Sequence, residues 1–404
     1  MRPSPTLFPY FVLDTSTLDG LATLAPETVL TDITSDVRWV NIRRGKMRET
    51  DRVTPGICQL GLNNASRKYD PTNTASIYYG NIAPMRLLYI TAVVAGTDYP
   101  LYRGYIQEWT VDYADQNLPL AGIVAADCLS LLARQDLATI AAAHSGDLPG
   151  ARISRILNLS EVSFPTDLRS IATGRVTMGD TTFGANALTS VEKVADADAG
   201  NLYASKLNVL TFEEGSTAPG ASVATFSDDG AASSIPYLTI DQANSRDLLY
   251  NRVVASGVSG TEQIATDAIS IADNQVSNLD RTGLPALNDA DLATLAAYLR
   301  GRYSTPDVRL RSCRVAVDSL AAARQAEILG LEITDRVTVA RTPPGGGTPA
   351  SITQSAAVAG LEWNIAAGGT GWACTATFQS GSRVFPLVLD DATLGLLDTA
   401  FLGA

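Results

Sequence analysis

The residue types that usually carry catalysis are scarce in this chain. Its single histidine, His144, adjoins Ser145 at the expected end of a helix. A general base there would need a nucleophile, and no G-x-S-x-G motif supplies one, so a solvated residue at a helix end is the simpler interpretation. One histidine excludes zinc hydrolysis through several imidazoles. The sequence also contains no G-x-x-x-x-G-K-[ST] loop for binding phosphate.

The four cysteines do not suggest a metal centre. None pairs with another at a metal-ligand spacing, and each stands in an apolar strand or at a helix start: Cys58, Cys128, Cys313 and Cys374. We expect them to be small buried hydrophobic residues. The sequence alone leaves a disulfide open, but it shows no dense disulfide framework.

Pairs of acidic residues are the remaining candidates for chemistry. They are Asp112 with Asp115, Asp196 with Asp198, Asp228 with Asp229, and Asp390 with Asp391. Two carboxylates can hydrolyse a glycosidic bond, but these pairs lie in turn-like contexts, where aspartate is favoured because it bonds the backbone. The segment 267–274 holds scattered oxygen ligands, yet it lacks the glycine and final glutamate of a calcium loop. We therefore predict no catalytic, cofactor-binding or metal-binding residue.

A basic run stands out against a net charge of −12. Six basic residues occupy fifteen positions: Arg38, Arg43, Arg44, Lys46, Arg48 and Arg52. We favour a strand edge whose arginines pair with carboxylates of neighbouring subunits. A solvated face and contact with DNA phosphates are the alternatives, and the overall charge opposes the second. Nearby aromatic residues suit a barrel core and interface anchors better than base stacking: Tyr69, Tyr78, Tyr79, Tyr102, Tyr105 and Trp109.

Length and composition predict a globular chain of several domains. It has 404 residues, of which 46% are hydrophobic and 18% charged, so sizeable cores can form. No apolar run reaches the roughly 18–20 residues that span a bilayer. Three prolines interrupt the N-terminal segment, so we expect no secretory signal: Pro3, Pro5 and Pro9. We likewise expect no stable insertion into a membrane.

Hydrophobic periodicity predicts a mainly β fold with α+β insertions. Alternating residues between 27 and 125 indicate a small antiparallel barrel, and a helix capped by Asp127 closes it. Asn186 is expected to cap a helix in the next unit, and Asn288 another that ends near Arg302. The predicted organisation is an N-terminal segment at 1–24, a first tube-like β-barrel at 25–145, an α+β domain at 146–245, a second β-barrel at 246–385 with a helical insertion near 286–303, and a C-terminal segment at 386–404. Residues 343–347, rich in proline and glycine, should form an exposed hairpin loop.

Several motifs resemble a known family. They include the runs Asn41–Arg52 and Gly56–Asn64, the segment Tyr69–Asn81, the strand Leu101–Trp109 with its L-x-x-G-x-I-x-x-W pattern, and the helix start Asp127–Leu132. Later stretches fit as well, among them Asn251–Val254, Leu292–Pro306 and Ile333–Val337. Over most of residues 25–403 the chain resembles the tail-tip hub, or minor tail protein, of long-tailed phages of actinobacteria. This family is similar to the baseplate hub of contractile-tailed phages.

The resemblance implies a structural role without catalysis. A homotrimer with two tube-like barrels per subunit would form a pseudo-sixfold ring that adapts the sixfold tail tube to a threefold tip. The implied partners are distal tail or tube proteins, the tape measure protein, and tail fibres or receptor-binding proteins. Viral DNA would pass through the channel without specific binding, and the protein would lie at the tail tip of the virion. The interface candidates are Arg43, Arg44, Lys46, Arg48, Arg52, Tyr78, Tyr79 and Trp109. A cell-wall glycosidase or peptidase and a carbohydrate-binding tail protein are the alternative functions.

Overall fold

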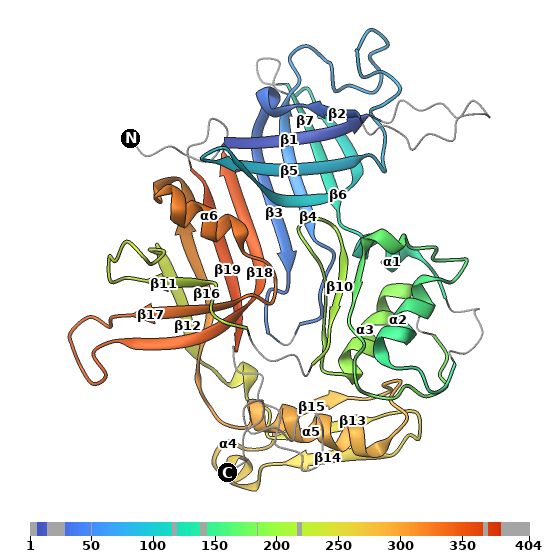
Figure 1. Cartoon of the computed structure of the whole chain (residues 1–404), viewed down its shortest axis with the longest axis vertical. Coiled ribbons are helices and arrows are strands. Elements are labelled where there is room, and N and C mark those ends of the chain that lie inside the picture. Colours follow the sequence, from blue (N-terminus) through green and yellow to red (C-terminus); the bar gives the residue numbers. More distant parts are fainter. Residues whose placement is uncertain are drawn as a thin grey trace.

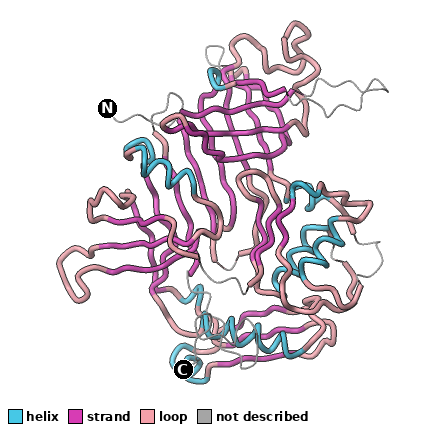
Figure 2. The backbone as a smooth tube through the Cα atoms, in the orientation of Figure 1, coloured by secondary structure: helices cyan, strands magenta, loops and turns pink. Residues whose placement is uncertain are grey.

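The computed structural model describes residues 6–13, 29–49, 51–114, 119–137, 144–183, 185–215, 220–366 and 371–380. These residues form one large β-sheet and two smaller α+β units beside it (Figure 1). Strands dominate the backbone, and most helices lie in the smaller units (Figure 2). The prediction of a mainly β chain with α+β parts is therefore confirmed.

Thirteen strands make up the large sheet. They are β1 (Thr6–Leu13), β2 (Val29–Asp32), β3 (Val37–Gly45), β4 (Ile57–Asn63), β5 (Leu87–Val94), β6 (Thr97–Asp112), β7 (Leu120–Ala126), β11 (Ala224–Ser227), β12 (Thr239–Asn244), β16 (Val308–Ala316), β17 (Arg336–Arg341), β18 (Ile352–Ala366) and β19 (Ala373–Ser380). Their order is β12-β16-β19-β18-β3-β4-β7-β6-β5-β1-β2, with β17 also on β18 and β11 on β17. Every pairing in this sheet is antiparallel except that of β11 with β17.

The two predicted β regions join edge to edge through β3 and β18. Glu362 of β18 lies opposite Arg43 of β3, and the pairing continues to Ala366 and Trp39. Strand β6 bends the first region, because its first half pairs with β5, its second half with β7, and the register shifts between Ile106 and Glu108. In Figure 1, β1, β5 and β6 cross in front of β3 and β4, so this half of the sheet curls on itself.

The first α+β unit follows β7. It contains the helices α1 (Leu129–Arg134), α2 (Pro149–Leu157) and α3 (Ala187–Ala197), and the strands β8 (Arg169–Ile171), β9 (Asn201–Ala204) and β10 (Leu210–Glu213). Strands β9 and β10 pair as an antiparallel hairpin. As predicted, the Asn186 side chain caps α3, since its oxygen accepts from the Thr189 amide at 2.8 Å. Strands β11 and β12, which follow, pair within the large sheet and not within this unit.

The second α+β unit is larger than the single helix expected near 286–303. It has a three-stranded sheet of β13 (Arg252–Ser256), β14 (Glu262–Thr266) and β15 (Asn278–Arg281), with α4 (Ala268–Asn274) and α5 (Asp289–Tyr303). Helix α5 packs on β13 and β14. The last helix, α6 (Ala322–Gly330), lies instead against β5 and β6 of the large sheet. Four short 3-10 turns complete the described elements: Thr34–Asp36, Thr166–Leu168, Arg246–Leu248 and Val317–Ser319.

Two main apolar cores hold these parts together. One fills the large sheet and includes residues of both β regions, such as Ile42 and Trp363. The other is shared by the two α+β units, with Ile153 and Val253 among its members. All four cysteines are buried with free thiols, which confirms their prediction as small hydrophobic residues.

The predicted terminal segments are described only in part. From the N-terminal segment 1–24 the structure describes β1, which pairs with β5 and β2. The predicted C-terminal segment 386–404 lies outside the described residues. The loop at 343–347 lies on the surface between β17 and β18, as expected. None of the described helices is both long and apolar enough to cross a membrane.

Candidate functional site

Arg44 belongs to the interior of the chain. The pleat of β3 turns it away from its neighbour Arg43, and its side chain is only 2% exposed. Its Nη1 lies 2.7 Å from Oε1 of Glu332 and also donates to the carbonyl of Ala204 at 3.4 Å. This corrects the assignment of Arg44 to a subunit boundary, because its partner is a carboxylate 288 positions along the same chain.

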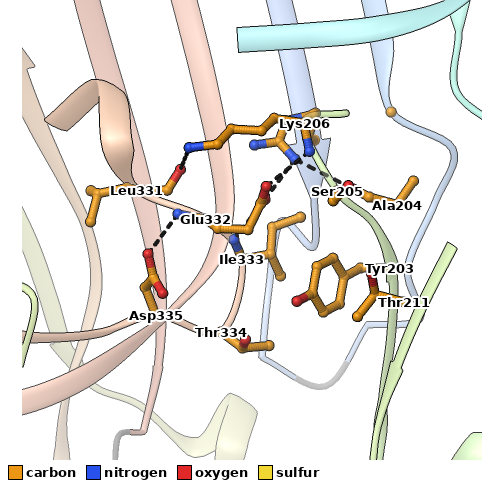
Figure 3. A network of polar contacts seen from close by, with 12 residues as sticks. Tyr203, Ala204, Ser205, Lys206, Thr211, Leu331, Glu332, Ile333, Thr334 and Asp335 are labelled. Atoms are coloured by element: carbon orange, nitrogen blue, oxygen red, sulfur yellow. Dashed lines mark hydrogen bonds and ion pairs between the residues drawn. The ribbon is translucent and has the colours of Figure 1, made fainter. Parts of the chain in front are cut away.

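Glu332 gathers contacts from three parts of the chain (Figure 3). Besides Arg44, its carboxylate accepts the backbone amide of Lys206 at 2.9 Å and that of Ile333 at 2.9 Å. The Nζ of Lys206 donates to the carbonyl of Gly330 at 2.6 Å. Since Lys206 follows β9 and Glu332 precedes β17, this polar junction ties the first α+β unit to both halves of the large sheet.

Glu49, one of two carboxylates inside the basic run, forms a second polar junction. Its side chain is 4% exposed, and Oε1 lies 2.5 Å from Nη2 of Arg302 and accepts from the Tyr303 hydroxyl at 3.2 Å. Arg309 approaches the other oxygen at 3.7 Å. These contacts connect the segment after β3 with α5 and with β16. The sequence offered one signal that we missed, a lone glutamate among arginines.

Arg52 makes the third internal link. Its guanidinium lies 3.2 Å from Asp196 and 3.9 Å from Glu192, both on α3, although 53% of its side chain stays exposed. Burial raises the pKa of Glu192 to about 7, and the charge of Arg52 opposes that rise. Two residues of the basic run, Arg44 and Arg52, thus pair with carboxylates of their own chain.

Two basic candidates still suit contact with another molecule. Arg43 and Arg48 are exposed, and the described residues form no ion pair with either. Lys46 is half-buried. A role at a subunit boundary therefore stays a prediction for Arg43 and Arg48.

The aromatic candidates likewise divide into residues packed inside the chain and one exposed residue. The Tyr69 ring stacks on Tyr78 at 5.6 Å and on Trp109 at 6.4 Å between centroids. Trp109 also donates through Nε1 to the carbonyl of Ala83 at 3.2 Å. Tyr78 is 8% exposed, so Tyr78 and Trp109 anchor the long loop between β4 and β5 inside the chain. Tyr79 is 52% exposed and stays an interface candidate.

Asp70 fixes the same loop from within. Its carboxylate accepts from the Thr72 hydroxyl at 2.6 Å, from Arg67 at 2.7 Å and from the Tyr113 hydroxyl at 2.7 Å. These bonds, that from Thr72 first, hold the pKa of Asp70 well below its usual range. A long loop without strands or helices is unusual unless it is functional, and this one is rigidly bonded.

The carboxylates considered for catalysis make structural contacts where they are described. Asp198 accepts backbone amides of Arg175 at 2.8 Å and Val176 and Gly215 at 3.2 Å. Asp112 and Asp229 each accept the backbone amide two residues further on, whereas Asp228 accepts that of Thr342, 114 positions away. Asp115, Asp390 and Asp391 lie outside the described residues. The interpretation as turn residues is confirmed for Asp112 and Asp229, whereas Asp196 lies within α3 and pairs with Arg52.

The other candidate sites are also accounted for. His144 is 69% exposed, with Nδ1 3.9 Å from Asp147. Asp267, at the segment weighed as a calcium loop, caps α4 by accepting the Ser270 amide at 3.0 Å. The described residues contain no cluster of three His, Cys, Asp or Glu side chains placed to hold a metal ion.

Asp127 closes the first β region. Its carboxylate accepts the Gly56 amide at 2.7 Å and the Leu129 amide at 3.0 Å, so it joins β4 to the start of α1. Complete burial raises its pKa to about 7, against these hydrogen bonds. The cap position of α1 is Cys128, and no side chain makes a capping bond there. The prediction of Asp127 as the cap is therefore wrong by one residue, although its carboxylate does accept the Leu129 amide at the start of the helix.

Comparison with known proteins identifies the fold. No family model matches the sequence, and no curated protein matches it. The tail protein of Neisseria meningitidis MC58 matches with a TM-score of 0.56 at 9% identity, over 94% of this chain and 97% of that one. The 43 kDa tail protein of prophage MuSo2 from Shewanella oneidensis matches with a TM-score of 0.56 at 11% identity, over 94% and 98%. This chain therefore shares the fold of these tail proteins along nearly its whole length.

Proposed function

We propose that this chain is a structural protein of a bacteriophage tail and that it forms the hub at the tail tip. The observation that carries the proposal is the match to two tail proteins over nearly the full length of both partners. Sequence identity near 10% shows the fold alone, so the tail role is our inference from that fold. The finer relation, to hubs of long-tailed phages of actinobacteria, rests on the sequence motifs.

The internal ion pairs suit a mechanical role. Arg44, Glu49 and Arg52 stand on one short stretch, and each holds a different part of the chain. A hub that joins rings of different symmetry must transmit force without changing shape. Three polar junctions in addition to two apolar cores would restrain the units against one another.

We further propose that three copies form the hub and adapt a sixfold tube to a threefold tip. The test is quantitative mass spectrometry of tails purified from virions, with the tube protein as an internal standard. Three copies per virion, together with gold-labelled antibody at the tip, would support the hub. Six copies would indicate a ring of the distal tube and would refute it.

We propose that viral DNA passes this protein without binding to it. The net charge is −12. Like charge disfavours adhesion to phosphate. Tight, salt-sensitive binding of duplex DNA by the purified protein would contradict this proposal.

The cell-wall hydrolase is the competing function with a direct assay. Purified protein would be incubated with host peptidoglycan, and the release of soluble fragments followed. We expect no release. Release that disappears in Asp196→Asn or Asp198→Asn would establish a hydrolase and displace the structural proposal. A carbohydrate-binding tail protein, the other alternative, has no specific observation in its favour.

A further inference from the structure

A groove of about 530 Å³ lies between the large sheet and the segment that follows β3. Its floor is partly apolar, and its sides come from β12, β16, β18 and β19 together with the residues before β13. Leu248, Leu310 and Phe378 contribute apolar surface to it. The volume is within the range of sites that hold a small ligand or a few residues of a peptide.

Most arginines that line the groove already contact other residues of this chain. Arg309 contacts Glu49 at 3.7 Å, donates to the carbonyl of Arg302 at 2.8 Å, and lies over the Tyr303 ring. Arg311 pairs with Asp247 at 3.3 Å. Arg311 therefore has a carboxylate partner of its own, whereas Arg309 shares Glu49 with Arg302.

Three other carboxylates line the groove without an ion pair to any described residue. They are Asp51 and Asp241, which are exposed, and Glu362, which is half-buried and accepts only from the Asn364 amide group at 3.1 Å. Arg48 is the single unpaired cation among the described lining residues. The groove thus combines apolar surface with an excess of unpaired negative charge.

We propose that this groove docks an extended segment of a partner protein and receives an arginine or lysine side chain of that segment. The aliphatic stem of such a side chain would pack on Leu248 and Leu310, and its charged end would meet Asp241 and Glu362. We assign the segment to a different protein with a basic stretch, because the unpaired carboxylates of the groove complement positive charge. A second copy of this chain is the other possible occupant, and the test below distinguishes the two.

The proposal does not depend on the tail role, and a binding assay on the purified full-length chain tests it. The probe is a fluorescein-labelled peptide amide with an arginine between two leucines, flanked by glycine and serine. A second peptide replaces the arginine by citrulline, which has nearly the same shape but no charge. Fluorescence anisotropy at low salt should show the arginine peptide binding at least tenfold more tightly.

Two variants test whether the groove is the binding place. Asp241→Asn with Glu362→Gln removes the free charges from solvent-accessible positions and should weaken binding of the arginine peptide at least tenfold. Ala243→Trp, on the wall of the groove, should block binding of both peptides while keeping every carboxylate. Glu108→Gln with Asp112→Asn is the matched control, because these residues lie on the same sheet face outside the groove. Circular dichroism would verify that each variant is folded.

Equal affinity for the arginine and citrulline peptides would overturn the proposal. So would unchanged binding by the Asp241→Asn, Glu362→Gln double variant, or an equal loss in the control pair. Concentration-dependent self-association of the wild type that Ala243→Trp abolishes would also overturn it, because a second copy would then be the occupant. None of these outcomes would change the proposed location of the protein in the tail, because that location is measured separately on virions.

Discussion

Glu332→Gln tests the view that an internal ion pair holds three parts of the chain together. The substitution keeps the size of the side chain and removes its charge. Arg44 would then be a guanidinium with 2% exposure and no carboxylate partner. The described neighbours at that place are the carbonyl of Ala204 and the amide side chain created at position 332.

The size of the effect follows from burial. Removing one member of a buried ion pair costs roughly 3–5 kcal/mol, because the other charge is left uncompensated. Glu332 is 20% exposed, so water reaches the site and the lower end, about 3 kcal/mol, is expected. Replacing both partners, as in Arg44→Met with Glu332→Gln, removes the stranded charge. The double variant should therefore be more stable than Glu332→Gln alone.

Hydrogen exchange measured by mass spectrometry shows which part of the chain loses stability in Glu332→Gln. A local cost of about 3 kcal/mol corresponds to roughly a hundredfold faster exchange of amides that open with the junction, here those of the β9–β10 hairpin. Arg43→Met with Glu362→Gln is the matched control, since these residues face each other on the solvent side of the same strands. Exchange in Glu332→Gln that equals the control would refute the reasoning. A double variant less stable than Glu332→Gln would refute it as well.

Three further outcomes are expected. Because the folded pKa of Glu192 is about 7 and that of an unfolded glutamate about 4.3, its contribution to stability is present below pH 4 and lost as the pH rises through 7. The melting temperature of Glu192→Gln should consequently fall less between pH 5 and pH 8 than that of the wild type, and equal slopes would exclude this carboxyl as the cause. Asn186→Ala should cost about 1 kcal/mol in urea unfolding, whereas Asn288→Ala should cost little, because only Asn186 makes a capping bond with its side chain. Arg43→Glu with Arg48→Glu should block tail assembly while the isolated chain stays folded, and normal infectious particles from that double variant would remove both residues from the subunit boundary.

Local features of the fold could be predicted from the sequence because they depend on neighbouring residues. The cap at Asn186 follows from side-chain chemistry within one turn. Helix α5 does begin after Asn288, but the predicted capping bond of the Asn288 side chain is absent. Alternation of apolar residues predicted the β region that contains β16 and β18, since the side chains of a strand point to opposite faces in turn. The buried cysteines followed from the apolar stretches around them.

Long-range pairings could not be predicted in the same way. The basic run predicted partners for its arginines, but nothing local indicated that Glu332 and Asp196 of the same chain would supply them. The joining of the two β regions through β3 and β18 could not be predicted either, because edge strands do not specify their neighbour by composition alone. The separate small sheet before α5 was missed because an apolar pattern predicts a strand but not the strands with which it pairs.

Arg43 and Arg44 show how one residue of register separates two functions inside a basic run. Adjacent side chains of a strand point to opposite faces, so the same stretch that buries Arg44 against Glu332 presents Arg43 to solvent. Charge reversal at Arg44 would damage the fold, and failed assembly in such a variant would say nothing about subunit contacts. Only variants of the exposed residues Arg43 and Arg48 can test whether the basic run binds a neighbouring subunit, because they leave the internal ion pair of Arg44 intact.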